Sequence, residues 1–301
     1  MTSILTNVAA MAALQTLRSI NNNLETTQNH VSSGYRVAKA ADNAAYWSIA
    51  TTMRSDNKAL SAVSDALGLG AAKVDTAYSA MDSAIDVVTE IKAKLVAATE
   101  KGVDRTKIQE EIKQLQSQLL SIAQSASFSG ENWVAGNETK SVVSSFVRDG
   151  NGNTSVTTTE YVLNSSSSGN VLFGTSNGSI DTATGIIGSA NGTVGSIFSL
   201  DISNFSTDDI SLALNTVEKG LESMTKAASQ LGSISTRIQL QENFVSSLSD
   251  SIDSGVGRLV DANMEEESSK LTALQTQQQL AIQSLSIANS SAQNVLTLFQ
   301  R

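Results

Sequence analysis

Apolar residues spaced alternately three and four positions apart run through long stretches of this chain, and this spacing constrains the fold more than any other feature. One run covers residues 46–95 and another covers residues 214–259, each for about seven heptads, which is typical of long coiled-coil-like helices. Proline, which breaks helices, is absent from all 301 residues. The sequence therefore predicts a mainly α protein built on two long helices.

Local signals indicate where these helices begin and where they are disturbed. Asp104 is a suitable N-cap for a third helix, and Ser206 with Asp209 three residues later predicts the start of the second long helix. Gly68 and Gly70 interrupt the first long helix, and we expect a bend or a close helix contact there. The stripe expected to be buried on that helix comprises Tyr46, Ala50, Met53, Asn57, Leu60, Ser64, Leu67, Ala71, Val74, Tyr78, Met81, Ile85, Val88, Lys92 and Leu95.

The end of the chain avoids charge without being hydrophobic enough for lipid. No Asp, Glu, Lys or Arg lies between Leu271 and Gln300, but Gln, Asn and Ser are too frequent there for a membrane span. The first helix, which we expect to stop at Gly34, is also poor in charge. Both ends therefore predict helices that are buried against protein.

Each terminal helix carries one regular apolar stripe and further apolar residues beside it. The stripes comprise Ala10, Ala13, Leu17, Ile20, Leu24, Thr27 and Val31 in the first helix, and Leu271, Leu274, Gln278, Ala281, Leu285, Ala288, Ala292, Val295 and Phe299 in the last. The additional apolar residues comprise Ile4, Val8, Met11 and Leu14, and Leu280, Ile282, Ile287, Leu296 and Leu298. Because one partner helix covers one side only, we expect these helices to have more than one partner.

Residues 141–205 have a different composition, rich in Ser, Thr, Gly and Asn. Short β-prone runs lie between turn residues there, namely "SVVSSFV", "TEYVLN", "NVLFG" and "GSIFSLDI". Because these runs recur regularly, we expect a small β-rich insertion rather than disorder.

Composition excludes several classes of function. The net charge of -9 and the lack of any basic cluster argue against nucleic acid as a partner. The absence of cysteine excludes disulfides and thiolate metal sites. No combination of nucleophile, base and oxyanion donor is recognisable, so we expect neither an enzyme nor a cofactor.

The remaining candidate sites favour structural interpretations. His30 has no Asp, Cys or second His near it in the sequence, which favours a structural role, and Glu265–Glu267 is expected to be a solvated turn. Residues 149–160 have the ligand spacing of a calcium loop, but Thr154 stands where that loop requires glycine. A β-turn is therefore the favoured prediction for this loop.

The N-terminal segment "MTSILTNVAAMAALQTLRSI" has no basic region before its apolar residues, and its first cation is Arg18. This pattern predicts no cleaved Sec signal peptide. The chain is therefore expected either to stay in the cytoplasm or to leave by another route.

The segment "LETTQNHVSSGYRVAKAADNAAYWSIATTMRSD" resembles the N-terminal signature of bacterial flagellin, most closely flagellins of the rhizobial type. Two further segments resemble that family, "SASFSGENWV" and the closing "NVLTLFQR". The residues at matching places are Ser32, Ser33, Gly34, Arg36, Asp42, Asn43 and Ala44. The resemblance covers about residues 1–140 and 206–301 in the order found in the family.

The resemblance implies a subunit that polymerises into the flagellar filament, alone or with sister flagellins, and that is exported unfolded to the cell exterior. It implies an export chaperone, a cap protein and hook-junction proteins as further partners. It also implies that the terminal helices line the central channel, which explains their lack of charge, since an unpaired buried charge costs several kcal/mol.

The residue patterns and the resemblance together divide the chain into three parts. Residues 1–43 and 264–301 are expected to form the inner filament core, residues 44–145 and 204–263 the long-helix rod, and residues 146–203 a variable outer domain. The residues expected at the assembly interface are Leu17, Ile20, Leu24, Val31, Arg36, Asp42, Leu274, Leu285, Ala288, Ala292, Val295 and Phe299.

Two alternatives remain open on the sequence alone. A hook-filament junction protein shares the terminal helices, and it is structural without forming a long polymer. A calcium-binding or enzymatic domain at residues 141–205 is the second alternative.

Overall fold

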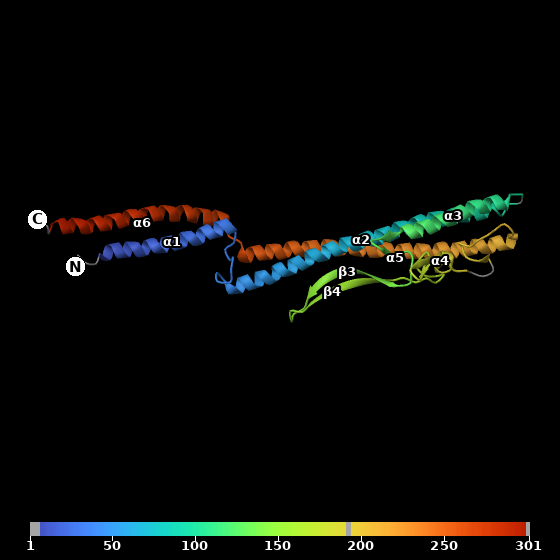
Figure 1. Ribbon diagram of the computed structural model, residues 1–301, viewed down its shortest axis with the longest axis horizontal. Coiled ribbons are helices and arrows are strands. Elements are labelled where there is room, and N and C mark those ends of the chain that lie inside the picture. The colour runs from blue at the N-terminus through green and yellow to red at the C-terminus, as the bar shows by residue number, and fades with distance from the viewer. Residues whose placement is uncertain (1–6, 101, 191–193, 299–301) are drawn as a thin grey trace. The chain divides into compact units, whose positions relative to one another are not determined.

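The computed structural model describes residues 7–100, 102–190 and 194–298, with the backbone alone over residues 291–298. The principal helices are α1 (Val8–Ser33), α2 (Ala44–Ala97), α3 (Arg105–Ser125), α5 (Thr207–Val260) and α6 (Met264–Leu298) (Figure 1). The shorter elements are β1 (Ser127–Phe128), β2 (Glu131–Asn132), β3 (Thr139–Arg148), β4 (Thr154–Val162), β5 (Gly174–Ser176), β6 (Ser179–Asp181) and α4 (Gly185–Gly188). The predicted mainly α fold, with paired terminal helices and a small β-rich insertion, is confirmed.

The chain divides into two compact units. One unit comprises residues 1–57 and 250–301, and the other comprises residues 58–249. The first holds α1, α6, the start of α2 and the end of α5, and the second holds the rest of the long helices, α3 and the strands.

In the first unit, side chains and backbone close both ends of α1. The Asn7 carboxamide accepts a hydrogen bond from the Ala10 amide at 3.0 Å, which satisfies one of the free amides of the first turn. At the other end Gly34 adopts the left-handed conformation (φ 75°), and its amide donates to the His30 carbonyl. The predicted stop at Gly34 is confirmed, and glycine suits it because it has no Cβ to clash.

A small apolar core lies where the loop after α1 meets the two long helices. Val37, Ala50, Val256 and Val260 are buried in it, with Met53 and two further residues of α5 packed around them. The amide of Val37 donates to the Val260 carbonyl at 3.1 Å. The loop is thereby attached to the end of α5.

In the second unit, α2 and α5 lie side by side in opposite directions. Ser235 donates to the Asp75 carboxylate at 2.9 Å, and Lys92 forms an ion pair with Glu218 further along. The buried residues between the helices include Val74, Ala77, Met81, Ala84, Val88, Ile91 and Leu95 of α2, and Val217, Met224, Ala227, Leu231, Ile234 and Ile238 of α5. The predicted stripe of α2 is wrong at Tyr46 and Tyr78, which are each 42% exposed.

The helix starts predicted from sequence are confirmed. The Asp104 carboxylate accepts from the Thr106 amide at 3.1 Å, and Ser206 and Asp209 form a reciprocal pair in which each side chain accepts from the other's amide. Hydrogen bonds from the hydroxyls of Thr106 and Ser206 lower the pKa of Asp104 and of Asp209 respectively. Both carboxylates are therefore favoured in the charged form that caps a helix.

The longest strands, β3 and β4, form an antiparallel hairpin. At its turn the Asp149 carboxylate accepts from the amides of Asn151 and Asn153 at 2.9 and 2.7 Å, and the Asn153 side chain donates to it as well. These bonds lower the pKa of Asp149, the Asn153 side chain contributing most. The predicted β-turn is therefore present, at the tip of this hairpin.

Two of the four predicted β-runs are wrong for most of their length. "NVLFG" contributes only Gly174 to a strand, and residues 195–202 form no strand, although Phe173, Ile197 and Leu200 are buried. In the second run, glutamine side chains make the hydrogen bonds to the backbone that a neighbouring strand would otherwise make. Gln109 donates to the Leu200 carbonyl and accepts from the Ile202 amide, and Gln116 donates to the carbonyls of Ile197 and Leu200. Buried glutamines therefore satisfy this backbone.

A close contact was expected at Gly68 and Gly70, and the structure has one at Gly70. Its partner is a strand, not the expected helix. A Cβ at Gly70 would overlap the Val142 side chain of β3, whereas a Cβ at Gly68 would meet nothing within 4 Å. Helix α2 continues through both positions. Gly70 thus lets the hairpin approach the helix.

Leu231 provides a test of the α2–α5 packing. It is fully buried, so Leu231→Ala should lower the free energy of unfolding by about 2–5 kcal/mol, as expected for a buried leucine that leaves a cavity. Leu240→Ala on the same helix is the matched control, because Leu240 is 65% exposed. Urea unfolding followed by circular dichroism measures both, and equal midpoints for the two variants would contradict the assigned packing.

Candidate assembly interface

Helices α1 and α6 pack against each other in opposite directions along their predicted stripes. Of the residues expected at the interface, seven lie on this seam, buried or half-buried within one chain: Leu17, Ile20, Leu24 and Val31 of α1, and Leu274, Leu285 and Ala288 of α6. Leu274 is the most buried of the α6 set, at 7% exposure. Ala292 and Val295 lie on the α6 backbone, but their side chains, and the whole of Phe299, are outside the described residues.

Polar contacts fix the register of this pair. The Asn7 side chain donates to the Ala288 carbonyl at 2.9 Å, and the Gln278 side chain donates to the Asn21 side chain at 2.8 Å. One contact lies at the start of α1 and the other near its middle. Of the three polar side chains only Gln278 belongs to a stripe, so polar residues beside the stripes also align the helices.

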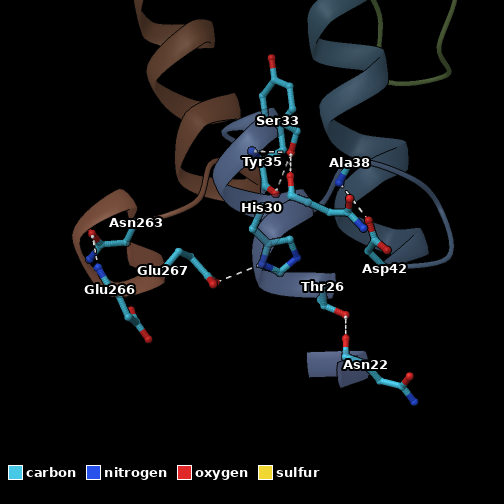
Figure 2. A network of polar contacts seen from close by, with 11 residues as sticks. Asn22, Thr26, His30, Ser33, Tyr35, Ala38, Asp42, Asn263, Glu266 and Glu267 are labelled. Carbon is cyan, nitrogen blue, oxygen red and sulfur yellow. Dashed lines mark hydrogen bonds and ion pairs between the residues drawn. The ribbon is translucent and has the colours of Figure 1, made fainter. Parts of the chain in front are cut away.

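A third contact joins a histidine and a carboxylate near the end of α1. His30 Nδ1 lies 3.0 Å from Glu267 Oε1, with the two side chains only 18% and 12% exposed (Figure 2). The second Glu267 oxygen and the hydroxyl of Thr27 are buried without a hydrogen-bond partner. The prediction that Glu265–Glu267 is a solvated turn is therefore wrong at Glu267.

Sequence reasoning missed this pair because its members are 237 residues apart. A usable signal was nonetheless present: Glu267 continues the three-four spacing of Leu271 and Leu274 backwards by one turn. A charged residue at a seam position requires a partner on the facing helix. His30 fulfils the structural role predicted for it.

Arg36 and Asp42, also expected at the interface, shape the loop between α1 and α2. The Arg36 guanidinium donates to the Leu259 carbonyl at 3.1 Å. The Asp42 carboxylate accepts from the amides of Ala38 and Lys39 at 3.0 and 3.1 Å (Figure 2). Both side chains therefore act within the chain, on its backbone.

Six of the additional apolar residues of the two terminal helices are exposed, whereas Ile4 and the side chains of Leu296 and Leu298 are outside the described residues. Val8, Met11 and Leu14 of α1 are 66%, 58% and 39% exposed. On α6 the exposed set comprises Leu280, Ile282 and Ile287, at 59%, 53% and 69%. We call these six residues the outward rows. Helices that carry such rows beside few charged residues are typical of surfaces that become buried in an assembly.

A shallow groove of about 430 Å³ lies between α1 and α6 beside the outward rows. Its walls comprise Ala13, Thr16, Ile20, Gln277, Leu280, Ala281 and Ser284. Small residues and an exposed leucine give it the shape to accept apolar side chains, with no ionisable group in its walls.

The described residues contain neither a metal-binding cluster nor a helix that could span a membrane. No group of three or more His, Asp or Glu side chains gathers there as a metal site. In the same part of the chain, every helix is too short or too polar to cross a membrane.

The His30–Glu267 contact can be tested by a double-mutant cycle. His30→Leu leaves the buried carboxylate without its partner and should destabilise the helix pair by about 1–3 kcal/mol. The double variant His30→Leu/Glu267→Leu should recover at least half of this loss, because replacing both partners removes the unpaired group. Hydrogen exchange of α1 and α6 amides reports the change.

Glu266→Leu serves as the control for that cycle, because Glu266 is exposed. Combined with His30→Leu, it should restore none of the lost protection. Recovery with Glu266→Leu, or none with Glu267→Leu, would show that the two seam residues are not coupled.

Fold and interface together define a class of protein, a helical structural subunit whose paired ends present apolar residues outward. Models of two regions match the chain, the bacterial flagellin N-terminal helical region over residues 4–139 and the C-terminal helical region over residues 214–299. The chain belongs to the bacterial flagellin family.

Curated relatives match this chain over its whole length. The chain is 55% identical to flagellin C of Rhizobium meliloti (strain 1021), 50% identical to flagellin B of Rhizobium meliloti and 45% identical to flagellin of Brucella melitensis, in each case covering all of both chains. The predicted resemblance to rhizobial flagellins is confirmed. These relatives support a structural subunit of the flagellar filament, an extracellular assembly, over a hook-filament junction protein.

Proposed function

We propose that copies of this flagellin assemble, together or with sister flagellins, through the outward rows of α1 and α6. The observation that carries the proposal is the exposure of six large apolar side chains on two helices that are already paired. Burying apolar surface contributes about 25 cal/mol per Å², so surrounding subunits gain stability by covering the rows. The nearby groove offers a place for apolar side chains of a neighbour.

In this proposal the residues of the α1–α6 seam have a different role from the outward rows. The stripe residues on α1 and α6, with Ala292, Val295 and Phe299 continuing the same spacing, hold the helices together so that the rows have fixed positions. Arg36 and Asp42 hold the loop that leads into α2. Substitution at any of these sites would act on assembly through the shape of the subunit.

The proposed placement in the filament follows the three parts predicted from sequence. Residues 1–43 and 264–301 would lie innermost, residues 44–145 and 204–263 would form the next layer, and residues 146–203 would face outward. The lack of charge on the inner helices is consistent with burial against several neighbours.

We also propose export of the unfolded chain to the cell exterior by the flagellar route, with an export chaperone, a cap protein and hook-junction proteins as partners. The composition suits refolding outside the cell. With no proline and no cysteine, folding is not slowed by proline isomerisation or disulfide exchange, which take seconds to hours. The role is structural, without catalysis.

Ile287 tests the outward rows. Ile287→Asp places a charge where a neighbour is expected, so we predict that the critical concentration for filament growth rises about a hundredfold or more, equivalent to about 3 kcal/mol. Ile287→Leu keeps an apolar side chain and should grow normally. Sedimentation of filaments grown from seeds measures both.

The helicity and thermal midpoint of the Ile287→Asp subunit should stay close to those of the unmodified chain, because the side chain is 69% exposed. Normal growth of Ile287→Asp filaments would refute the proposal. So would a loss of helicity large enough to explain the assembly defect.

A further inference from the structure

Aromatic side chains are rare in this chain, 4% of its residues, yet three of them are exposed close together in the sequence. Tyr35, Tyr46 and Trp47 are 37%, 42% and 37% exposed. The other tryptophan, Trp133, is 1% exposed. A folded chain with few aromatic residues would ordinarily place them in its core, because each can bury 150–250 Å².

An arginine contacts one of these residues and lies on the same side of α2 as another. The Arg54 guanidinium lies over the Tyr35 ring, 4.7 Å from its centroid. Trp47 and Arg54 are seven residues apart on α2, so they lie on the same side of the helix, and Tyr46 is adjacent. We call Tyr35, Tyr46, Trp47 and Arg54 the aromatic patch.

The backbone beneath Tyr35 is firmly held. The Tyr35 amide donates to the Ser33 hydroxyl at 3.2 Å (Figure 2), and Tyr35 also forms a β-bridge with Asp261. The Ala262 amide donates to the Gly34 carbonyl at 2.9 Å. A partner that binds here therefore does not have to order this segment first.

The start of α2 is held in a similar way. The Asn43 side chain accepts from the Tyr46 amide at 3.1 Å, and its carbonyl accepts from the Trp47 amide at 2.9 Å. Ala50, one turn further on, is buried in the apolar core of the unit. Tyr46 and Trp47 thus remain exposed on a helical turn whose backbone is fixed.

The patch also carries a cation without a carboxylate partner. Within the described part of the chain, Arg54 contacts the face of Tyr35 and forms no ion pair. The chain as a whole has 29 acidic and 20 basic residues. A second copy of the chain therefore offers a surface with more carboxylates than cations, which is complementary to an aromatic surface that carries an arginine.

We propose that the aromatic patch is a contact surface for a second copy of this chain, whose carboxylates approach Arg54 while its apolar groups cover Trp47 and Tyr46. Tryptophan, tyrosine and arginine are the residues that dominate binding energy at protein interfaces. The inference rests on the proposed assembly of copies, and it adds a contact whose residues are separate from the outward rows. In the proposed assembly each subunit lies beside other copies, which supplies this partner at high local concentration.

Tryptophan fluorescence tests the contact directly. The difference between the unmodified chain and Trp47→Phe isolates the Trp47 emission, because Trp133 contributes equally to both. On assembly, this difference spectrum should shift to shorter wavelength and resist quenching by acrylamide. Filaments in which Trp47 stays as quenchable as in the monomer would overturn the inference while leaving the proposed assembly intact.

Assembly itself is followed in the same samples by sedimentation and electron microscopy. If the unmodified chain forms no filaments from seeds, the proposed assembly fails and the inference fails with it. The two failures are thus distinguished by whether filaments are present when Trp47 is still accessible.

Two substitutions test the energetic part of the inference. Trp47→Ala should raise the critical concentration about tenfold or more, the effect of truncating one hot-spot residue, whereas Trp47→Phe should raise it much less. Arg54→Gln should also raise it, and more so at low salt, where an ion pair is screened least.

Lys58→Gln is the matched control for Arg54→Gln, since it removes the same charge from an exposed position one turn further along α2. It should leave the critical concentration unchanged. Equal effects of Arg54→Gln and Lys58→Gln would assign the change to net charge, and an unaltered critical concentration for Trp47→Ala would overturn the contact.

Discussion

The geometry of two paired helices limits what this subunit can bury alone. A helix packed against one partner covers one stripe, and α1 and α6 each carry apolar residues beyond that stripe. The seam is covered within the chain, while the outward rows remain in contact with water. From Leu271 to the end of α6 there is no charged residue, and Arg18 and Glu25 are the only Asp, Glu, Lys or Arg residues of α1, so little in their composition opposes a further layer of protein around them. The helix pair of this flagellin thus keeps apolar surface that one chain cannot cover, which is the basis of the proposed assembly.

The second unit shows how the same kind of helix behaves when its partners are in the chain. Along α2 and α5, buried positions face each other, and Gly70 allows the β3–β4 hairpin to lie directly against α2. Buried glutamines on α3 satisfy the backbone of residues 197–202, which needs no neighbouring strand. This unit therefore has a core of its own, whereas the helix pair of the first unit keeps exposed apolar rows.

The structural features that depend on local sequence patterns could be predicted from the sequence. The helix starts at Asp104 and Ser206, the stop at Gly34 and both terminal stripes could be predicted, because capping and amphipathicity act over a few residues. The His30–Glu267 contact could not, since it joins residues far apart in the chain. Tyr78 was misassigned because a strict seven-residue repeat drifts around a straight helix, and Ala77 takes the buried position.

The strand predictions for residues 170–174 and 195–202 were wrong for a different reason. Their apolar composition correctly indicated burial, but burial does not distinguish a strand from an extended segment. Over residues 195–202, two glutamines some eighty to ninety residues earlier take up hydrogen bonds that a strand partner would otherwise provide. Residues 170–174 instead bond to the backbone of separate segments, such as Val134 and Ile186. A pattern read along the chain contains no sign of that arrangement.

The polar contacts in the α1–α6 seam explain how this helix pair can have one register. A purely apolar heptad seam would tolerate a shift by seven residues, since each stripe residue would meet an equivalent one. A shift in one direction would bring His30 beside Leu274, and a shift in the other direction would leave Glu267 facing the apolar region near Leu24. A buried carboxylate without a partner is costly, so the shifted pair is disfavoured even though its apolar contacts are similar. Because the register fixes where the rows of α1 lie relative to those of α6, a contact hidden inside the chain determines how the exposed apolar rows are arranged.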